Sequence, residues 1–275
     1  MPVIIILILA VLAYSYGVMK ICSRGSSRVM PRLRQMSAFG AGIFITYIAL
    51  ASPLENYADY LLSAHMVQHL LLMLVAAPLL LWGRPMPYLI WFFPATLRRR
   101  TGLLRIVRGL SATVRALQKP ATTWSLFCGV VVLWHIPAIY RWAMADEFRH
   151  SLMHVSFLAA GVLFWSVVRD AGRRRRLDYA SSALFVFSAA LLTGLPGALI
   201  TFTRRPLYVP ASHHPIPFGL TALEDQQLAG LIMWIPMDLI LFCVALVLLA
   251  AALRAPNRAA RSSNVAARAP TFLPF

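Results

Sequence analysis

The sequence predicts an all-α protein, a helix bundle that crosses a lipid bilayer about seven times. Three observations lead to this fold class. Sixty per cent of the 275 residues are hydrophobic, whereas a soluble domain is usually roughly 45–50% apolar. Apolar runs of about 20 residues recur along the chain, and this is the length that a helix needs to span a bilayer. The basic residues collect in every second connection between these runs.

Seven apolar runs are long enough to form membrane-spanning helices. No Lys or Arg precedes the first run and several follow it, which is the reverse of a cleaved signal sequence, so we expect a retained first span. We predict one transmembrane bundle domain over residues 1–254. A disordered tail is expected over 255–275, because that segment is rich in Ala, Arg, Ser and Pro. The expected spans are 2–22, 36–52, 59–82, 121–143, 148–169, 179–203 and 227–253.

The distribution of Lys and Arg predicts the orientation of the chain. With the N-terminus outside, all but four of the 26 Lys and Arg residues fall in cytoplasmic segments, as the positive-inside rule requires. The C-terminus is then cytoplasmic. The same rule accounts for the net charge of +17, so we expect a lipid bilayer, and no nucleic acid, as the partner of the basic residues. The four exceptions are Arg141, Arg149, Arg204 and Arg205.

The histidines carry the strongest functional signal, because all seven fall in the outer halves of predicted spans or in outer loops. His65 and His69 lie on the third span, four residues apart, and His150 and His154 repeat this spacing on the fifth. Residues i and i+4 share one helix face about 6 Å apart. His135 lies at a similar depth on the fourth span. Three helices are therefore expected to present imidazoles in one layer.

A layer of neutral imidazoles suits a transition metal, and neighbouring thioethers favour copper in its reduced state. Met66 and Met153 each adjoin a histidine in the sequence. The predicted ligands are therefore His65, His69, His135, His150, His154, Met66 and Met153. Two histidines on different helices also suit haem, and this alternative stays open. A further pair, His213 and His214, lies in the outer loop before the last span, where the sequence does not decide between metal binding and an ordinary loop.

Acidic and amide residues open the last predicted span. Either Asp225 and Glu224 cap the start of this helix, or Asp225 or Gln226 orients a liganding imidazole from behind. Asp238 lies near the middle of the same span, and the sequence does not indicate its role. The chain contains no GxSxG, P-loop or HExxH motif, so we do not expect an enzyme.

At these residues the chain resembles the multi-span CtaG family of cytochrome c oxidase assembly factors. The resemblance covers about residues 35–252. Residue by residue, it maps the family's histidine positions onto His65, His69, His135 and His154, and its acidic-Gln motif onto Asp225 and Gln226. The stretches that carry it are Ser63–Leu72, Leu133–Pro137, His154 with Phe157, Gly161 and Trp165, and Asp225–Trp234.

This resemblance implies a protein of the bacterial plasma (inner) membrane that helps to build a haem–copper oxidase and has the oxidase subunits as partners. The expected task is delivery of copper to the oxidase metal centre. Three alternatives remain at this point: a copper transporter, a haem-binding membrane protein that transfers electrons, and an assembly scaffold that binds no metal. The sequence names neither the metal nor the oxidase subtype nor the oligomeric state.

Overall fold

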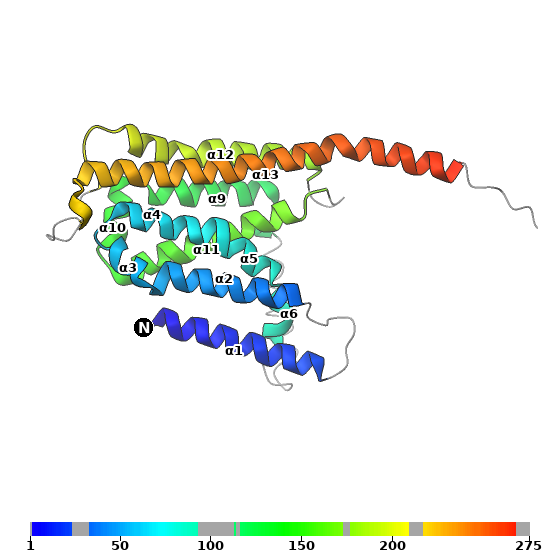
Figure 1. The fold of residues 1–275 in the computed structure, drawn as a ribbon, viewed down its shortest axis with the longest axis horizontal. Helices are drawn as coiled ribbons and strands as arrows, with labels where there is room; N and C mark the ends of the chain where they lie inside the picture. The colour runs from blue at the N-terminus through cyan, green and yellow to red at the C-terminus, as the bar shows by residue number, and fades with distance from the viewer. Residues whose placement is uncertain are drawn as a thin grey trace, which may run out of the picture.

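The computed structural model describes residues 2–23, 33–92, 113, 116–172, 177–208 and 217–267. These ranges contain helices and turns and no strand, so the predicted fold class is confirmed. Six helices are long and apolar enough to cross a membrane, and a bent pair of helices would make a seventh span. Figure 1 shows the long helices lying side by side in one bundle, with α1 at its edge.

The long helices agree closely with the predicted spans. They are α1 (Pro2–Cys22), α2 (Leu33–Ala51), α11 (Glu147–Arg169), α12 (Tyr179–Phe202) and α13 (Ala222–Ala267). The third span, Leu62–Trp82, is built from α4 (Leu62–Leu70), the π-helix η2 (Leu71–Ala76) and α5 (Ala77–Trp82). The shorter elements are α3 (Pro53–Ala58), α6 (Met86–Leu89), η3 (Ile90–Phe92) and η4 (Pro217–Gly219).

The expected fourth span is broken at the histidine that it carries. The chain forms α9 (Pro120–Trp134) and α10 (Pro137–Met144), and the two helices meet at an angle of 77°. Pro137 is the first residue of α10, and Ile136 before it is extended, with φ −75° and ψ 122°. Proline disfavours a helical conformation in the residue before it and has no N–H for the preceding turn. The α9 helix therefore ends at Trp134, and His135, its C-cap, lies at a turn in the chain.

Local caps explain where several helices begin. Asp146 accepts a hydrogen bond from the Arg149 N–H at the start of α11, and Asp178 does the same for Ser181 at the start of α12. Ser52 caps α3, which Pro53 opens. This separate helix explains why the third span starts at Leu62 rather than at the expected residue 59. Such caps satisfy backbone donors that the helix itself leaves free.

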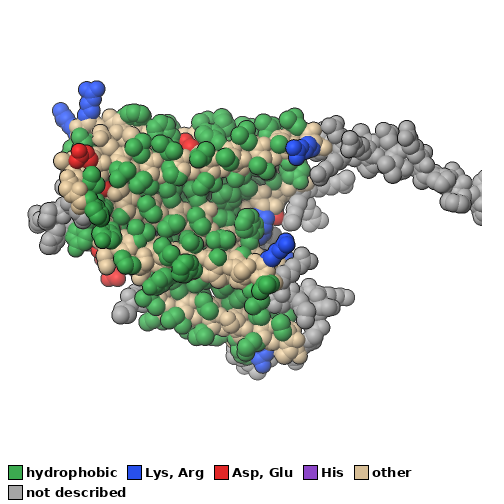
Figure 2. All heavy atoms as spheres, viewed as in Figure 1, with side chains coloured by type: hydrophobic (Ala, Val, Ile, Leu, Met, Phe, Trp, Pro, Cys, Tyr) green, Lys and Arg blue, Asp and Glu red, His purple; other side chains and the backbone are tan. Residues whose placement is uncertain are grey.

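The core lies between the third span, α9, α11, α12 and α13, and its largest fully buried side chains include Phe127, Phe157 and Phe164. A smaller cluster joins α1 to α2 and α6, with Tyr14 stacked on Phe39 at 4.0 Å between ring centroids. Figure 2 shows apolar side chains covering the flank of the bundle and most of the charged groups near its two ends. This pattern fits a lipid-exposed surface.

Some of the sequence predictions fall on segments that the structure does not describe. His213 and His214 lie outside the described residues, as do residues 268–275. The helix α13 continues to Ala267, beyond the predicted boundary of the bundle at residue 254. Disorder of the tail and the orientation of the termini both stay predictions.

Candidate metal site

The α4 helix contributes two imidazoles to the interior of the bundle. His65 and His69 are both buried, and their ring centroids lie 4.3 Å apart. The spacing of four residues places them on one face of the helix. That face is directed toward α11 rather than toward lipid, because both rings contact histidines of that helix.

The α11 helix brings a second pair against the first. The His65 ring lies 5.2 Å from the His150 ring and 5.6 Å from the His154 ring, measured between centroids. His69 lies 5.5 Å from His154. One ring nitrogen from each of His65, His150 and His154 can be chosen so that all three lie within 4.8 Å of one another. A small shift of these side chains would bring three nitrogens around one metal ion.

These imidazoles lack the hydrogen bonds that buried polar groups normally make. Among the described residues, no hydrogen-bond partner faces either ring nitrogen of His65 or His69, or the Nε2 atoms of His150 and His154. Each unsatisfied buried group costs about 1–3 kcal/mol. Several such atoms directed into one space are expected where a ligand supplies the missing interactions. The cluster therefore fits a metal ion better than it fits hydrogen-bonded packing.

His135 adds a fifth imidazole with a thioether beside it. Its Nδ1 lies 2.6 Å from the carbonyl oxygen of Val131, and its Nε2 lies 3.3 Å from Sδ of Met66. A neutral imidazole that donates from Nδ1 keeps a lone pair on Nε2. Nitrogen and sulfur lone pairs then face the same region. The His135 ring lies 5.9 Å from His69 between centroids, so this pair joins the cluster.

The second predicted thioether has different surroundings. Met153 is fully buried within the large apolar core, and its role as a ligand stays a prediction. The five histidines His65, His69, His135, His150 and His154 are thus brought together by three helices. For Met66 a contact with one of these imidazoles is seen.

Asp225 supports the cluster through the backbone of α4. Its carboxylate accepts hydrogen bonds from the N–H groups of Leu62 and Ser63, at 2.7 and 3.1 Å, and from the Ser63 hydroxyl at 2.5 Å. An acidic group at a helix N-terminus satisfies free donors and is favoured by the helix dipole. Asp225 thus caps the helix that carries His65 and His69. Asp225 does not cap its own helix, α13. That cap is made by Glu224, which pairs reciprocally with Thr221.

Gln226 supports the cluster through the chain segment before α13. Its Oε1 accepts hydrogen bonds from the N–H groups of Leu207 and Tyr208 at 2.6 and 3.2 Å. The Tyr208 hydroxyl donates to the carbonyl oxygen of His135 at 2.5 Å. Burial raises the pKa of Tyr208 to about 12, so this donor keeps its proton near neutral pH. Both predicted supporting residues therefore act on the backbone, and neither hydrogen bonds to one of the five described histidines.

Four further residues at the cluster were not among the sequence predictions. Phe157 packs on His69 at 4.1 Å, and Tyr140 meets the edge of His65 at 5.5 Å, both between ring centroids. The Gln68 amide donates to the carbonyl of Ala49 at 2.7 Å and to the Glu55 carboxylate. Burial raises the pKa of Glu55, while the hydrogen bond from Gln68 opposes that shift. Gln68 could have been flagged as a further polar residue within an apolar run, whereas two ordinary aromatic residues carry no such signal.

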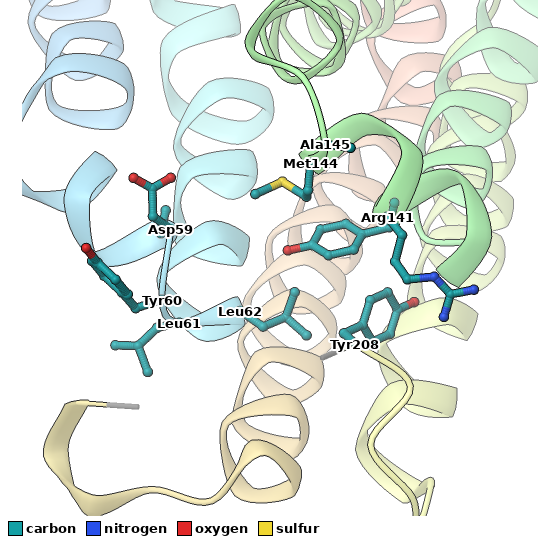
Figure 3. A pocket seen from close by; sticks show the side chains of 10 residues that line it. Asp59, Tyr60, Leu61, Leu62, Arg141, Met144, Ala145 and Tyr208 are labelled. Carbon is teal, nitrogen blue, oxygen red and sulfur yellow. The ribbon is translucent and has the colours of Figure 1, made fainter. Parts of the chain in front are cut away.

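Two cavities lie next to the cluster. The first, of about 620 Å³, lies between α1, the junction of α2 with α3, and α11, and both His150 and His154 line it. The second, of about 210 Å³, has Asp59 and Tyr60 on one side and Arg141 and Tyr208 on the other (Figure 3). Tyr140 lines the second cavity and contacts His65.

Asp238 lies away from this cluster, on the face of α13 that packs on α12. Its Oδ2 accepts a hydrogen bond from Trp234 Nε1 at 2.9 Å, which supplies the partner that the sequence did not identify. Its Oδ1 is buried, and no residue in the described ranges hydrogen bonds to it. A Cβ atom at Gly194 would lie 2.6 Å from Oδ2, so a larger residue on α12 would displace this carboxyl group.

The fold and the cluster together define a multi-span helical membrane protein with a buried group of histidines at one end of its bundle. The chain belongs to the cytochrome c oxidase caa3 assembly factor family (Caa3_CtaG), whose profile matches residues 12–255. This match confirms the resemblance found in the sequence.

Similar curated proteins occur in mycobacteria, and all are described as uncharacterized. Those of Mycobacterium bovis and Mycobacterium tuberculosis are each 25% identical over 248 residues, which cover 86% of this chain and 36% of the relative. One from Mycobacterium leprae is 22% identical over 259 residues, covering 90% of this chain and 38% of the relative. The chain thus spans little more than a third of the length of these relatives. No solved structure matches the chain.

Proposed function

We propose that this protein takes part in building a caa3-type cytochrome c oxidase in the bacterial plasma membrane by holding copper as cargo in its histidine cluster. The family assignment supports the assembly role. The observation that carries the copper role is the convergence of buried ring nitrogens that lack hydrogen-bond partners. On this proposal the protein is not an enzyme, and its partners are the oxidase subunits.

The donor set favours copper in its reduced state. Imidazole accepts several transition metals, but thioether sulfur selects for Cu(I), and Met66 Sδ lies 3.3 Å from His135 Nε2. The described cysteines are single and free, so no thiolate pair competes for the metal. Neutral ligands hold Cu(I) without the charge of thiolates, which suits a cargo that must be released to the oxidase.

The test is copper binding by the purified protein in a mild detergent. Wild-type protein is loaded with Cu(I), freed of excess metal, and compared with the double variant His65→Ala/His154→Ala. We expect near-stoichiometric copper in the wild type and loss of most of it in the variant, because it lacks two of the three imidazoles whose ring nitrogens lie within 4.8 Å of one another. The control His213→Ala/His214→Ala removes the same number of imidazoles from elsewhere in the chain and should keep its copper.

Other outcomes identify the rival functions. A Soret band in the visible spectrum of the purified protein would replace copper by haem and indicate an electron carrier. A folded wild-type protein that binds no copper would leave a scaffold for the oxidase subunits. Copper movement into sealed vesicles that contain only this protein would indicate a transporter. Loss of copper from the control variant alone would place the metal away from the cluster.

A further inference from the structure

The cavity of about 620 Å³ connects the surface of the bundle with two of the clustered histidines. Its apolar walls include Ile4 and Ile6 from α1 and Val155 from α11. His150 and His154 line its inner side. His154 is only 4% exposed, and within the described part of the chain its Nε2 has no hydrogen-bond partner. A ligand that enters this cavity therefore contacts the side chains of two histidines of the cluster.

Two carboxylates line the same cavity. Glu55 comes from α3 and Glu147 from the first turn of α11. They are two of only nine acidic residues in a chain with a net charge of +17. Carboxylates in a cleft with low-dielectric walls concentrate cations and can raise association rates by about 10- to 1000-fold. This cavity therefore favours a cation, even though the whole molecule is strongly basic.

The second cavity is a poorer approach to the cluster. Among the described residues that line it there is no histidine, and its lining residue Tyr140 contacts His65. The guanidinium of Arg141 lies in its wall together with Asp59, so a positive charge there would repel an incoming cation. Its volume of about 210 Å³ is also about a third of that of the first cavity.

We propose that the cavity between α1, α3 and α11 is the access route by which the copper cation reaches the histidine cluster. Glu55 and Glu147 attract the cation, His150 meets it first, and His154 passes it to the imidazoles of α4. The order follows from burial, since both residues line the cavity but His150 is half-buried, whereas His154 is buried and its ring lies 5.5 Å from that of His69 on α4. This inference rests on the proposed copper binding.

The test measures the rate of copper loading separately from the amount bound. Cu(I) is supplied as its acetonitrile complex, a monocation, and binding is followed by tryptophan fluorescence in a stopped-flow instrument. The variant Glu55→Gln/Glu147→Gln should load at least about tenfold more slowly at low salt and reach the same final copper content. Its rate should also depend less on ionic strength, because the steering charges are gone. Glu224→Gln, an exposed acidic residue on α13, should load like the wild type.

A matched pair of bulky substitutions distinguishes the two cavities. Ser151→Trp narrows the proposed route, and Ala145→Trp narrows the cavity that Asp59 and Arg141 line. We expect slow loading in the first variant and wild-type loading in the second. Should Ser151→Trp fail to fold, the glutamine variants still decide the question, since they keep side-chain size.

The measurements distinguish failure of the proposed access route from failure of the proposed copper binding. A wild-type protein that binds no copper overturns both. Normal copper content with unchanged loading rates in Glu55→Gln/Glu147→Gln overturns the access route alone. Slow loading in Ala145→Trp with normal loading in Ser151→Trp would also overturn it, because the ion would then pass through the other cavity.

Discussion

Met66 and Met153 are chemically identical and equally buried, with 1% and 0% of their surfaces exposed, yet their surroundings differ. Both side chains belong to the large apolar core, but among the described residues it is Met66 whose Sδ lies beside an imidazole nitrogen, Nε2 of His135. We predict that Met66→Leu weakens Cu(I) binding by roughly tenfold, about 1.4 kcal/mol, because a thioether ligand is lost. Competition with a Cu(I) chelator measures the affinity.

Met153→Leu is the matched control for this prediction. Exchange of Met for Leu nearly preserves volume and usually costs less than about 1.5 kcal/mol of stability. Both variants should therefore fold, and the Met153 variant should bind copper like the wild type. Equal losses of affinity in the two variants would mean that Met66 acts by packing alone.

Asp225 allows a second test at the scale of single residues. Replacement by alanine removes the acceptor for Leu62 N–H, Ser63 N–H and the Ser63 hydroxyl. We expect Asp225→Ala to lower the free energy of unfolding by about 1–3 kcal/mol, and to weaken copper binding because the first turn of α4 positions His65. Asp225→Asn keeps one acceptor oxygen, so its stability and its copper affinity should lie between those of the wild type and those of Asp225→Ala. Thermal unfolding in detergent checks the first effect, and wild-type stability of the alanine variant would contradict it.

The sequence was sufficient to predict which imidazoles meet, because helical spacing and depth in the membrane are simple functions of residue number. His65, His69, His135, His150 and His154 all lie in one cluster. The partners of Asp225 could not be predicted, since they depend on how α13 packs on α4. Glu55 was missed for a similar reason: its place beside the cluster depends on the turn between α2 and α4.

At the scale of elements, two interruptions of regular helix lie beside the histidines. The α9–α10 break follows from Pro137, but its angle of 77° is fixed by packing that the sequence does not reveal. The π-helix Leu71–Ala76 follows directly after His69 and α4, and no residue type marks it in advance. Such π segments are frequent at functional sites. Here the carbonyl of Met73 in this segment accepts a hydrogen bond from Trp165 on α11 at 2.8 Å.

Close contact with Gly161 of α11 holds the π segment in place. A Cβ at Gly161 would lie 3.0 Å from the Ala77 Cβ and 3.1 Å from the Met73 carbonyl oxygen. We predict that Gly161→Ala costs about 1–3 kcal/mol of stability, as overpacking usually does, and that it also lowers copper affinity by shifting α4 against α11. Unfolding curves and copper titration measure the two effects.

Gly129 on α9 is the matched control, because a Cβ there meets nothing within 4 Å. Gly129→Ala should leave stability unchanged or raise it by up to about 1 kcal/mol, because alanine is favoured over glycine inside a helix, and it should leave copper binding intact. A stable Gly161→Ala protein with normal copper affinity would show that the α4–α11 spacing is not critical for the site.

At the scale of the whole molecule, the histidine cluster and the described basic residues of the predicted cytoplasmic connections lie at different ends of the bundle, whereas Arg141, Arg149, Arg204 and Arg205 lie at the histidine end. Lys20 falls in the last turn of α1, Arg34 in the first turn of α2, Arg84 after α5 and Arg169 in the last turn of α11. The histidines come from the beginning of α4, the end of α9 and the beginning of α11. If the basic end faces the cytoplasm, copper is held on the outer side. A reporter enzyme fused to the C-terminus tests this orientation, and activity outside the cell would contradict it.

In living cells, a variant with slow copper access and a variant without copper ligands should respond differently to added copper. A strain with Glu55→Gln/Glu147→Gln still has all five imidazoles, so a higher copper concentration should compensate for slow access and restore oxidase activity in its membranes. A strain with His65→Ala/His154→Ala lacks the ligands, and added copper should restore little. Oxygen consumption by isolated membranes, with protein levels checked by immunoblotting, measures both strains. Rescue of the histidine variant by copper would show that the cluster is dispensable for assembly, whereas failure to rescue the glutamine variant would mean that Glu55 and Glu147 do more than attract the ion.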